Sequence, residues 1–498
     1  MPAFVPIPLG QRIPASLHAV SCSLPTMRAV RGYEEKDPEI VRAMTSGYPR
    51  FVVHPFLQQL ASHVAQTRGL DGHTLWAASS ERMARRLAEH LGAAHATLLS
   101  DGDIHFVAHP AATELASRAK TFLQHTGGFL SSRAAEDRLA QLGLVRPTPE
   151  LRFAGDALAE VRRHLAPLFT GVPTDQLFLT NCGMSAVDAA FRAVAELQAS
   201  RGRTIWVQLG WLYLDTIALL KKFTASPVDY VHVRDVFDLA ALERLFAERG
   251  DRIAGLVAEA PTNPLVQMPD LPGLAALVHR HGARLILDPS ITSSHNIDVL
   301  PHADVVVSSL TKYAASEGDL TAGLVVVNPA GSDAAILLRH LSAKIEPLYA
   351  RDLARLAAQI GTAPQVLARI NANVQHVVDF LRSHPNVKEI HWALAPASRA
   401  NYLRVARTPE SVGCMITFTL HLPLERFYDR VRLPKGPSFG MKTSLLCPFM
   451  YLAHYDLVTT PTGRAELQAS GLDPDLLRLA VGAEPIEDIL AALAEALA

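Results

Sequence analysis

The stretch ADVVVSSLTKYAASEGDL, residues 303–320, contains a run of β-branched apolar residues that ends abruptly in Ser-Ser-Leu-Thr-Lys-Tyr. Such a run is typical of a strand that is buried on both faces of a parallel sheet. Ligands of open parallel α/β sheets bind at the carboxyl ends of the strands. Ser309, Thr311 and Lys312 directly follow or end this strand, so we expect them to lie in a ligand site.

The flanking residues predict the sheet to which this strand belongs. Between residues 203 and 330, short β-branched runs alternate with amphipathic segments. This alternation predicts a mainly parallel sheet that is covered by helices on both faces. The expected strands are 203–209, 227–233, 252–260, 283–288, 303–310 and 322–328, and the expected helices are 215–223, 239–250 and 271–282.

The length of the chain requires more than one core. With 498 residues, it exceeds the size at which one hydrophobic core stops growing, so we expect about two or three domains. Residues 353–384 read as a long helical stretch, and a second α/β segment follows it. We therefore expect an N-terminal arm with an extra segment (1–150), a large domain (151–340) and a smaller C-terminal α/β domain (341–498).

Charge and composition exclude several classes of function. Lys and Arg number 47 against 48 Asp and Glu, and no basic run is interleaved with aromatics, which argues against a nucleic-acid partner. No apolar stretch is long enough to cross a bilayer, and the proline-broken start MPAFVPIPLGQRIP does not resemble a signal peptide. Four scattered cysteines favour reduced thiols in the cytoplasm. His279 and His281 suit a helix end better than a metal site.

Other polar residues are expected at the same sheet edge. Asp288 ends the strand 283–288, Glu259 ends the strand 252–260, and Gly183 opens an amphipathic helix. Each alone is more often a turn residue, a helix cap or a solvated charge. Together, a phosphate cradle at a helix start, an isolated lysine and a carboxylate are what holds pyridoxal phosphate as a Schiff base.

The motifs that carry these residues resemble those of a known family. SSLTKY (308–313) resembles the S-x-T-K-Y segment of the Cys/Met-metabolism family of pyridoxal-phosphate enzymes, which adopt the aspartate-aminotransferase fold. TSGYPRF (45–51), QHTGGFLSSRAAE (124–136) and DPSITSSHNIDVLPHAD (288–304) are most similar to the branch that contains fungal-type cystathionine γ-synthases. Further matching motifs are CGMSA (182–186), LYLDT (212–216), EAPTNP (259–264), SFG (438–440) and the C-terminal segment 476–497.

This resemblance implies a role for each matching residue. Lys312 would hold the cofactor covalently and then move protons between the substrate carbons and the cofactor. Asp288 would keep the pyridine nitrogen protonated, and Tyr213 would stack on the ring. The phosphate would be bound by the backbone of Gly183 and Met184, by the hydroxyls of Ser309 and Thr311, and by Tyr48 and Arg50 of a neighbouring subunit.

The resemblance also implies substrate contacts and an assembly. Arg478 would bind the substrate carboxylate, with Ser438 also facing the substrate and Asn263 beside the phenolic oxygen of the cofactor. A shared site would require a homo-oligomer, either a dimer or a tetramer. Asp215 and Cys182 stand where the family usually has glycine and serine, and Ser316-Glu317 replaces Gly-His. These departures concern the substrate rather than the cofactor.

Several activities share this machinery. The first expectation is γ-replacement on an O-acylhomoserine with cysteine to give cystathionine, a step of transsulfuration and methionine biosynthesis. The alternatives are a cystathionine or methionine lyase acting by elimination, and an O-acylhomoserine sulfhydrylase. A non-catalytic pyridoxal-phosphate-binding protein is a further alternative from another class.

Overall fold

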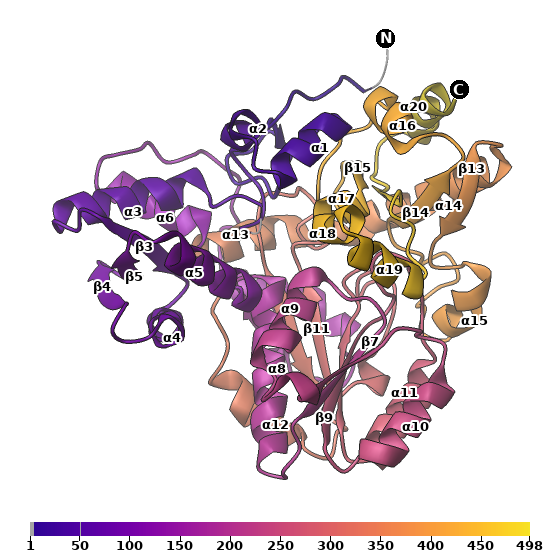
Figure 1. Ribbon diagram of the computed structural model, residues 1–498, viewed down its shortest axis with the longest axis horizontal. Helices are drawn as coiled ribbons and strands as arrows, with labels where there is room; N and C mark the ends of the chain where they lie inside the picture. The colour runs from indigo at the N-terminus through magenta and orange to yellow at the C-terminus, as the bar shows by residue number, and fades with distance from the viewer. Residues whose placement is uncertain (1–3, 50) are drawn as a thin grey trace.

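The computed structural model describes residues 4–49 and 51–498, and its central feature is a seven-stranded sheet in that part of the chain (Figure 1). Neighbouring strands from β11 to β8 run parallel, whereas β12 runs antiparallel to β11 and β6. The expected mainly parallel α/β fold is confirmed. The strand order is β6 (Phe178–Thr180), β12 (Gly323–Val327), β11 (Val305–Ser309), β10 (Arg284–Asp288), β9 (Ile253–Glu259), β7 (Ile205–Leu209) and β8 (Tyr230–Val233).

Helices cover both faces of this sheet because its strands are apolar on both sides. Val257 packs in the same core cluster as helix α8, whereas its neighbours Leu256 and Ala258 pack in the cluster that contains the helices of the other face. One face carries α8 (Gly183–Ala199), α9 (Leu214–Phe223) and α12 (Ala334–Ser342), and the other carries α10 (Leu239–Arg249) and α11 (Leu271–Arg280) (Figure 1).

The C-terminal region is built on a smaller, antiparallel sheet. Its strand order is β13 (Val387–His391), β14 (Met415–Leu420), β16 (Leu477–Ala480) and β15 (Leu445–Pro448). The helical stretch expected over 353–384 is two helices, which are separated at Gly361 and Thr362. The helices of this region are α13 (Ala350–Ile360), α14 (Ala363–Ser383), α15 (Pro396–Leu403), α16 (Leu424–Arg430), α17 (Phe449–Ala453), α18 (Tyr455–Thr459), α19 (Pro461–Ala469) and α20 (Ile486–Leu497).

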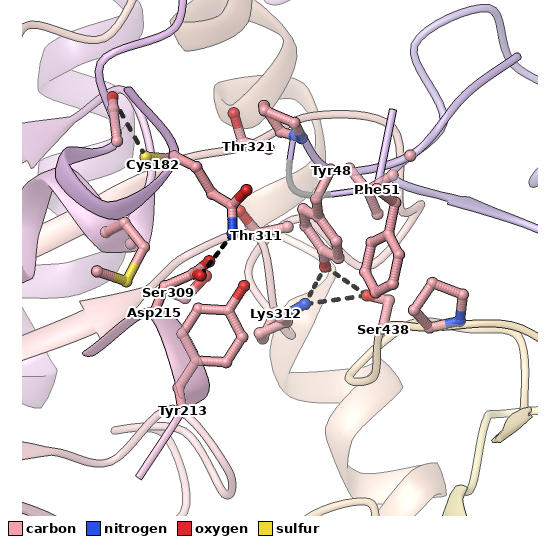
Figure 2. Close-up of a pocket in the computed structure, with 18 of the residues that line it drawn as sticks. Tyr48, Phe51, Cys182, Tyr213, Asp215, Ser309, Thr311, Lys312, Thr321 and Ser438 are labelled. Atoms are coloured by element: carbon pink, nitrogen blue, oxygen red, sulfur yellow. Dashed lines mark hydrogen bonds between the residues drawn. The ribbon is translucent and has the colours of Figure 1, made fainter. Parts of the chain in front are cut away.

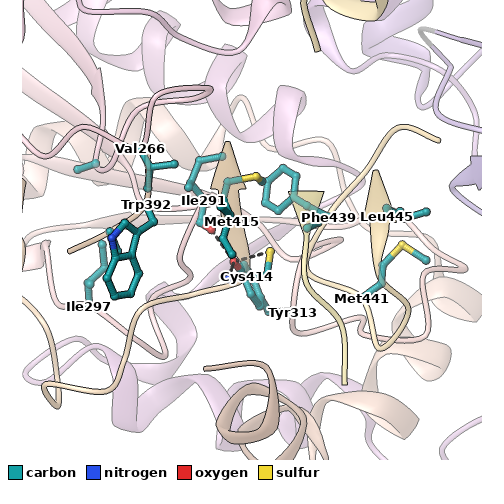
Figure 3. Close-up of a cluster of buried hydrophobic side chains, with 14 of the residues drawn as sticks. Val266, Ile291, Ile297, Tyr313, Trp392, Cys414, Met415, Phe439, Met441 and Leu445 are labelled. Carbon is teal, nitrogen blue, oxygen red and sulfur yellow. Dashed lines mark hydrogen bonds between the residues drawn. The ribbon is translucent and has the colours of Figure 1, made fainter. Parts of the chain in front are cut away.

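A buried cluster joins the large sheet to this smaller sheet (Figure 3). Tyr313, which follows Lys312, is fully buried there. Its hydroxyl donates to the carbonyl of Ile291 and accepts from the backbone N–H of Cys414 at 3.1 Å. Tyr313 therefore anchors the loop after β11 between the two sheets, and this anchor fixes the direction in which Lys312 leaves the backbone.

The arm, residues 4–49, packs against the C-terminal region of its own chain. The backbone N–H of Leu24 donates to the carbonyl of Lys435 at 3.0 Å, and the hydroxyl of Tyr428 donates to the carbonyl of Leu24 at 2.8 Å. The arm contains β1 (Arg12–Ile13), β2 (Ser21–Cys22), α1 (Met27–Glu34) and α2 (Pro38–Ala43).

Residues 53–150, here called the inserted module, form a unit with its own core, including the fully buried Leu60, Met83 and Phe106. The sequence patterns predicted helices and loops here but not the antiparallel sheet β3-β5-β4. Its elements are α3 (Pro55–Thr67), β3 (His73–Ala78), α4 (Glu81–Leu91), β4 (Thr97–Asp101), β5 (Ile104–Pro110), α5 (Thr113–Thr126) and α6 (Ser132–Gln141), and α7 (Ala157–Leu165) follows it. Among the helices of residues 4–49 and 51–498, none has the length and apolarity that a bilayer crossing requires.

Candidate active site

The site is a cavity of about 230 Å³ at the carboxyl edge of the large sheet. The arm, the inserted module, the large sheet and the C-terminal region all contribute to its wall (Figure 2). Except for Arg50, which lies outside the described residues, every residue that the sequence assigned to the site lines this cavity. They are Tyr48, Gly183, Met184, Tyr213, Asn263, Asp288, Ser309, Thr311, Lys312, Ser438 and Arg478.

Lys312 projects into the middle of the cavity (Figure 2). Its Nζ donates hydrogen bonds to the hydroxyls of Tyr48 and Ser438, the latter at 3.0 Å. The surrounding protein removes the amine from bulk water, and this desolvation, aided by the positive charge of Arg478, holds the pKa of Lys312 well below its usual value. A neutral amine can act as a nucleophile and as a base.

Tyr48 lies beside Lys312 of its own chain. The resemblance assigned this tyrosine to the site of a neighbouring subunit, but its hydroxyl accepts the hydrogen bond from Lys312 of the same chain. The reason is that the arm packs on its own chain, where the N–H of Val20 donates to the carbonyl of Gly318 at 2.9 Å. Within one chain the tyrosine thus already lies beside the lysine, and a contribution from a neighbouring subunit stays a prediction.

Two carboxyls lie side by side at the sheet edge, because Asp288 and Glu259 are paired in register on β10 and β9. Burial raises the pKa of Asp288 to about 6. Burial and the neighbouring Asp288 raise the pKa of Glu259 well above its usual value. Glu259 accepts from the backbone N–H of Tyr213, but its Oε2 has no hydrogen-bond partner in the described structure. This acidic pair suits a cationic ring N–H.

The start of helix α8 lines the cavity at the place where the sequence analysis expects a phosphate cradle. A Cβ atom on Gly183 would lie 2.9 Å from the Cβ of Ser309, so only glycine permits this close approach of the helix to β11. The backbone N–H of Ser309 donates to Ser290 Oγ at 2.7 Å. The hydroxyl of Thr311 accepts from the N–H of Ala322 at 3.0 Å and thus also braces this edge. Free N–H groups at a helix start bind phosphate well.

Arg478 supplies the positive charge opposite the cradle. Its guanidinium donates weakly to Asn263 Oδ1 at 3.4 Å and to the carbonyl of Ser438 at 3.3 Å, and lies over the rings of Phe439 and Phe449. It forms no ion pair with a described side chain, whereas its fork geometry matches a carboxylate. It is therefore free to bind a substrate carboxylate.

Sequence reasoning missed one polar contact across the cavity wall. Asp215, a departure from the usual family motif, accepts a hydrogen bond of 2.7 Å from Nε2 of Gln124 in the inserted module (Figure 2 shows Asp215). Both residues line the cavity. The unusual aspartate was visible in the sequence, but its partner lies 91 positions away.

Cys182 also lines the cavity, and burial raises the pKa of its thiol, as expected of a packed residue rather than a nucleophile.

These features fit pyridoxal phosphate. Three features match parts of this cofactor. The amine of Lys312, whose pKa is lowered, suits the aldehyde, the acidic pair with its unpartnered oxygen suits the ring nitrogen, and the glycine-only approach at Gly183 suits the phosphate. Fold and cavity thus define a pyridoxal-phosphate-dependent enzyme. The model of the Cys/Met metabolism PLP-dependent enzyme family matches residues 157–498, and the chain belongs to that family.

Two curated relatives match nearly the whole chain. The chain is 40% identical to L-2-amino-4-chloropent-4-enoate dechlorinase/desaturase of Streptantibioticus cattleyicolor, with 95% of each protein covered. It is 26% identical to cystathionine gamma-synthase of Neurospora crassa, with 99% of this chain and 98% of the relative covered.

Solved structures support the fold. Cystathionine gamma synthase of Xanthomonas oryzae pv. oryzae in complex with cystathionine has a TM-score of 0.58 at 23% identity, and the match covers 73% of this chain and 96% of that one. Cystathionine gamma-lyase of Lactobacillus plantarum complexed with L-serine has a TM-score of 0.58 at 22% identity, with 69% and 86% covered. The solved enzymes are thus matched over most of their length, while more than a quarter of this chain has no counterpart in them.

Proposed function

We propose that the protein catalyses γ-elimination on an L-α-amino acid that carries a leaving group at Cγ, such as a 2-amino-4-chloropent-4-enoate. Elimination was the alternative in the sequence analysis, where γ-replacement with cysteine stood first. The observation that carries the change is the charge inventory of the cavity, and the 40% identity to a dechlorinase/desaturase over 95% of both chains supports it.

Among the residues that the structure describes, the cavity has one arginine available for a carboxylate. Arg133 also lines it, but this guanidinium is ion-paired with Glu150 at 2.8 Å and Asp352 at 2.9 Å. Arg478 has no such partner among the described residues. An elimination binds one amino acid and needs one carboxylate anchor, whereas replacement by cysteine needs a second amino acid, with its own carboxylate, in the same cavity.

The rest of the wall suits a short apolar side chain. Four apolar side chains line the cavity. They are Val52, which follows the arm, Leu123 and Leu130 of the inserted module, and Leu452 of α17. A chlorinated vinyl group is close in polarity to these four side chains, which themselves offer no hydrogen-bond donor to the carbonyl oxygen of an acylhomoserine ester.

Each polar residue then has a task. Arg478 binds the substrate carboxylate. Nζ of Lys312, whose pKa is lowered, takes the proton from Cα and returns protons later, held by the hydroxyls of Tyr48 and Ser438. The bound cofactor supplies the electron sink that stabilises negative charge at the substrate carbon. In balance, the substrate loses one proton and one chloride ion and gains one carbon–carbon unsaturation.

The second candidate is γ-replacement of an O-acylhomoserine by cysteine to give cystathionine, as in methionine biosynthesis. The full-length match to the Neurospora crassa cystathionine gamma-synthase favours it. An O-acylhomoserine sulfhydrylase would use the same residues with sulfide in place of cysteine.

A substrate panel separates these functions. The purified protein with added pyridoxal phosphate is given L-2-amino-4-chloropent-4-enoate, or O-acetyl-, O-succinyl- or O-phosphohomoserine with cysteine, sulfide or no thiol. Chloride release and product masses are recorded, with Lys312→Ala as the blank. We expect chloride and a product lighter by one HCl. Cystathionine formed faster than chloride would overturn elimination in favour of synthesis, and inertness toward all substrates would favour a non-catalytic binding protein.

We also propose that the enzyme is a cytoplasmic homo-oligomer, a dimer or tetramer, as the resemblance implies. The four cysteines are all free thiols, which suits a reducing compartment. Light scattering of the holoenzyme tests the assembly, and a monomer at micromolar concentration would contradict it.

A further inference from the structure

The inserted module touches the phosphate cradle at one glycine. Gly127 ends helix α5 in the left-handed conformation, with φ at +66°. A Cβ atom here would lie 2.4 Å from the backbone nitrogen of Ser185 and 2.5 Å from Sγ of Cys182. Both of those atoms belong to the start of α8. Glycine is therefore required at this position by the backbone conformation and by the neighbouring helix.

Hydrogen bonds continue this contact around the first turn of α8. The carbonyl of Gly127 accepts from Asn181 Nδ2 at 2.8 Å. Asn181 Oδ1 in turn accepts from the hydroxyl of Ser185, which accepts from the backbone N–H of Cys182 at 3.3 Å. A continuous chain of polar contacts thus runs from the module to the residue just before Gly183.

Two further ties hold the module against the same part of the site. Arg86 forms a two-pronged ion pair with Asp188 of α8, at 2.7 and 3.1 Å, and Asp188 is 2% exposed. Gln124 donates to Asp215 in the first turn of α9, directly after Tyr213. The module therefore contacts both helices whose starts line the cavity.

We propose that the inserted module is part of the cofactor-binding site and that Gly127 is a positioning residue for the phosphate cradle. The match of the family model begins at residue 157, so the module lies outside the region that this model matches. In this chain, the turn at Gly127 packs against the start of α8 at Cys182 and Ser185.

The physical reason is the short range of hydrogen bonds. Backbone N–H groups hold a phosphate oxygen only at about 2.7–3.2 Å. A Cβ at 2.4 Å from the nitrogen of Ser185 must move that nitrogen or the module away by several tenths of an ångström. The displaced N–H groups of α8 would then meet the phosphate at longer distance and poorer angle.

Gly143 offers a matched control. It follows α6 in the same module, has nearly the same φ, +72°, and would place a Cβ with nothing within 4 Å. Gly127→Ala and Gly143→Ala therefore carry the same backbone strain, and only the first one presses on α8. Comparing the two variants distinguishes the effect of contact with α8 on cofactor affinity from the effect of backbone strain.

The test measures cofactor affinity, not activity. Apo-protein of each variant is titrated with pyridoxal phosphate and with pyridoxal, which lacks the phosphate, by absorbance. We expect Gly127→Ala to raise the Kd for pyridoxal phosphate about tenfold or more with little change for pyridoxal, and Gly143→Ala to change neither by more than about twofold. Equal Kd values for the two variants, or an equal loss for both ligands, would overturn the proposal.

A second variant keeps the proposal testable if Gly127→Ala does not fold. Asn181→Ala keeps the glycine and removes the amide that bonds its carbonyl. We expect the same selective loss of pyridoxal phosphate affinity, with circular dichroism of the apo-protein unchanged. If Asn181→Ala retains the wild-type ratio of the two affinities, the contact has no role in phosphate binding.

Discussion

Asp288 and Glu259 stand opposite each other on adjacent parallel strands, so that two carboxyls share one edge of the sheet without an ion-pair partner in the described part of the chain. Burial raises the pKa of both groups, and for Asp288 it reaches about 6. A cationic ring nitrogen would lower the free-energy cost of ionising one of these carboxyls, because it offers the carboxylate a hydrogen bond and a positive charge.

Cofactor affinity should therefore depend on pH. Below a pKa of about 6, Asp288 is protonated and cannot attract a cationic ring; above it, the ionised carboxylate can. We expect the affinity of apo-protein for pyridoxal phosphate to rise between about pH 5 and 7. In Asp288→Asn the affinity should be lower and this rise smaller. Fluorescence titration across the pH range measures both, and parallel curves for the two proteins would contradict the assignment.

Tyr48→Phe tests the hydroxyl beside Lys312. The ring stays in place while the hydrogen bond to Nζ is lost. Losing a hydrogen bond costs about 0.5–1.5 kcal/mol, so we expect kcat to fall about 2- to 10-fold. Tyr230→Phe, which removes a hydroxyl bonded to Gln208 outside the cavity, is the control. Steady-state kinetics decide, and a wild-type kcat for Tyr48→Phe would exclude this role.

Arg478→Lys tests the carboxylate anchor. Lysine keeps the charge but cannot form the two parallel hydrogen bonds of a guanidinium. We expect kcat/KM to fall about 10- to 100-fold while the absorbance of the bound cofactor is retained. Arg404→Lys, at an exposed ion pair with Asp270, should behave as wild type. Arg478→Lys with unchanged kcat/KM would show that the carboxylate is bound elsewhere.

Leu130→Asn tests the apolar wall and depends on the proposed elimination. Leu130 lines the cavity, whereas the control position Leu98, on β4, is 45% exposed and does not. We expect kcat/KM for the chlorinated substrate to fall about tenfold, since a lost apolar contact costs about 1–3 kcal/mol. Leu98→Asn should leave it unchanged. Equal kcat/KM values for the two variants would show that Leu130 does not contribute to substrate recognition.

Arg133→Met tests how the inserted module is attached. The Arg133 side chain is 1% exposed and bonds Glu150, Asp352 and the carbonyl of Asp319. Removing one partner of a buried ionic network leaves charges unpaired, and we expect the free energy of unfolding to drop by about 3–5 kcal/mol. Arg85→Met, at a solvent-exposed pair with Glu81, should leave the unfolding midpoint unchanged. Denaturant unfolding of both variants measures the difference.

The large sheet could be predicted because its signals are local. The strand expected over 283–288 is observed as Arg284–Asp288, and that expected over 303–310 as Val305–Ser309. The β-branched runs and amphipathic helices can be recognised from a few neighbouring residues. The sheet of the inserted module could not be predicted in this way. Its strand Thr97–Asp101 is largely exposed and carries no continuous apolar run.

By itself, the sequence determined the order of strands and helices and the chemical groups at the strand ends, including Lys312 and Asp288, because periodicity and motif order are properties of neighbouring residues. The tertiary structure alone decided that Tyr48 meets the lysine of its own chain, 264 positions away, and that Gln124 meets Asp215. Such contacts depend on how the arm and the inserted module pack on the body, and no local pattern encodes that packing.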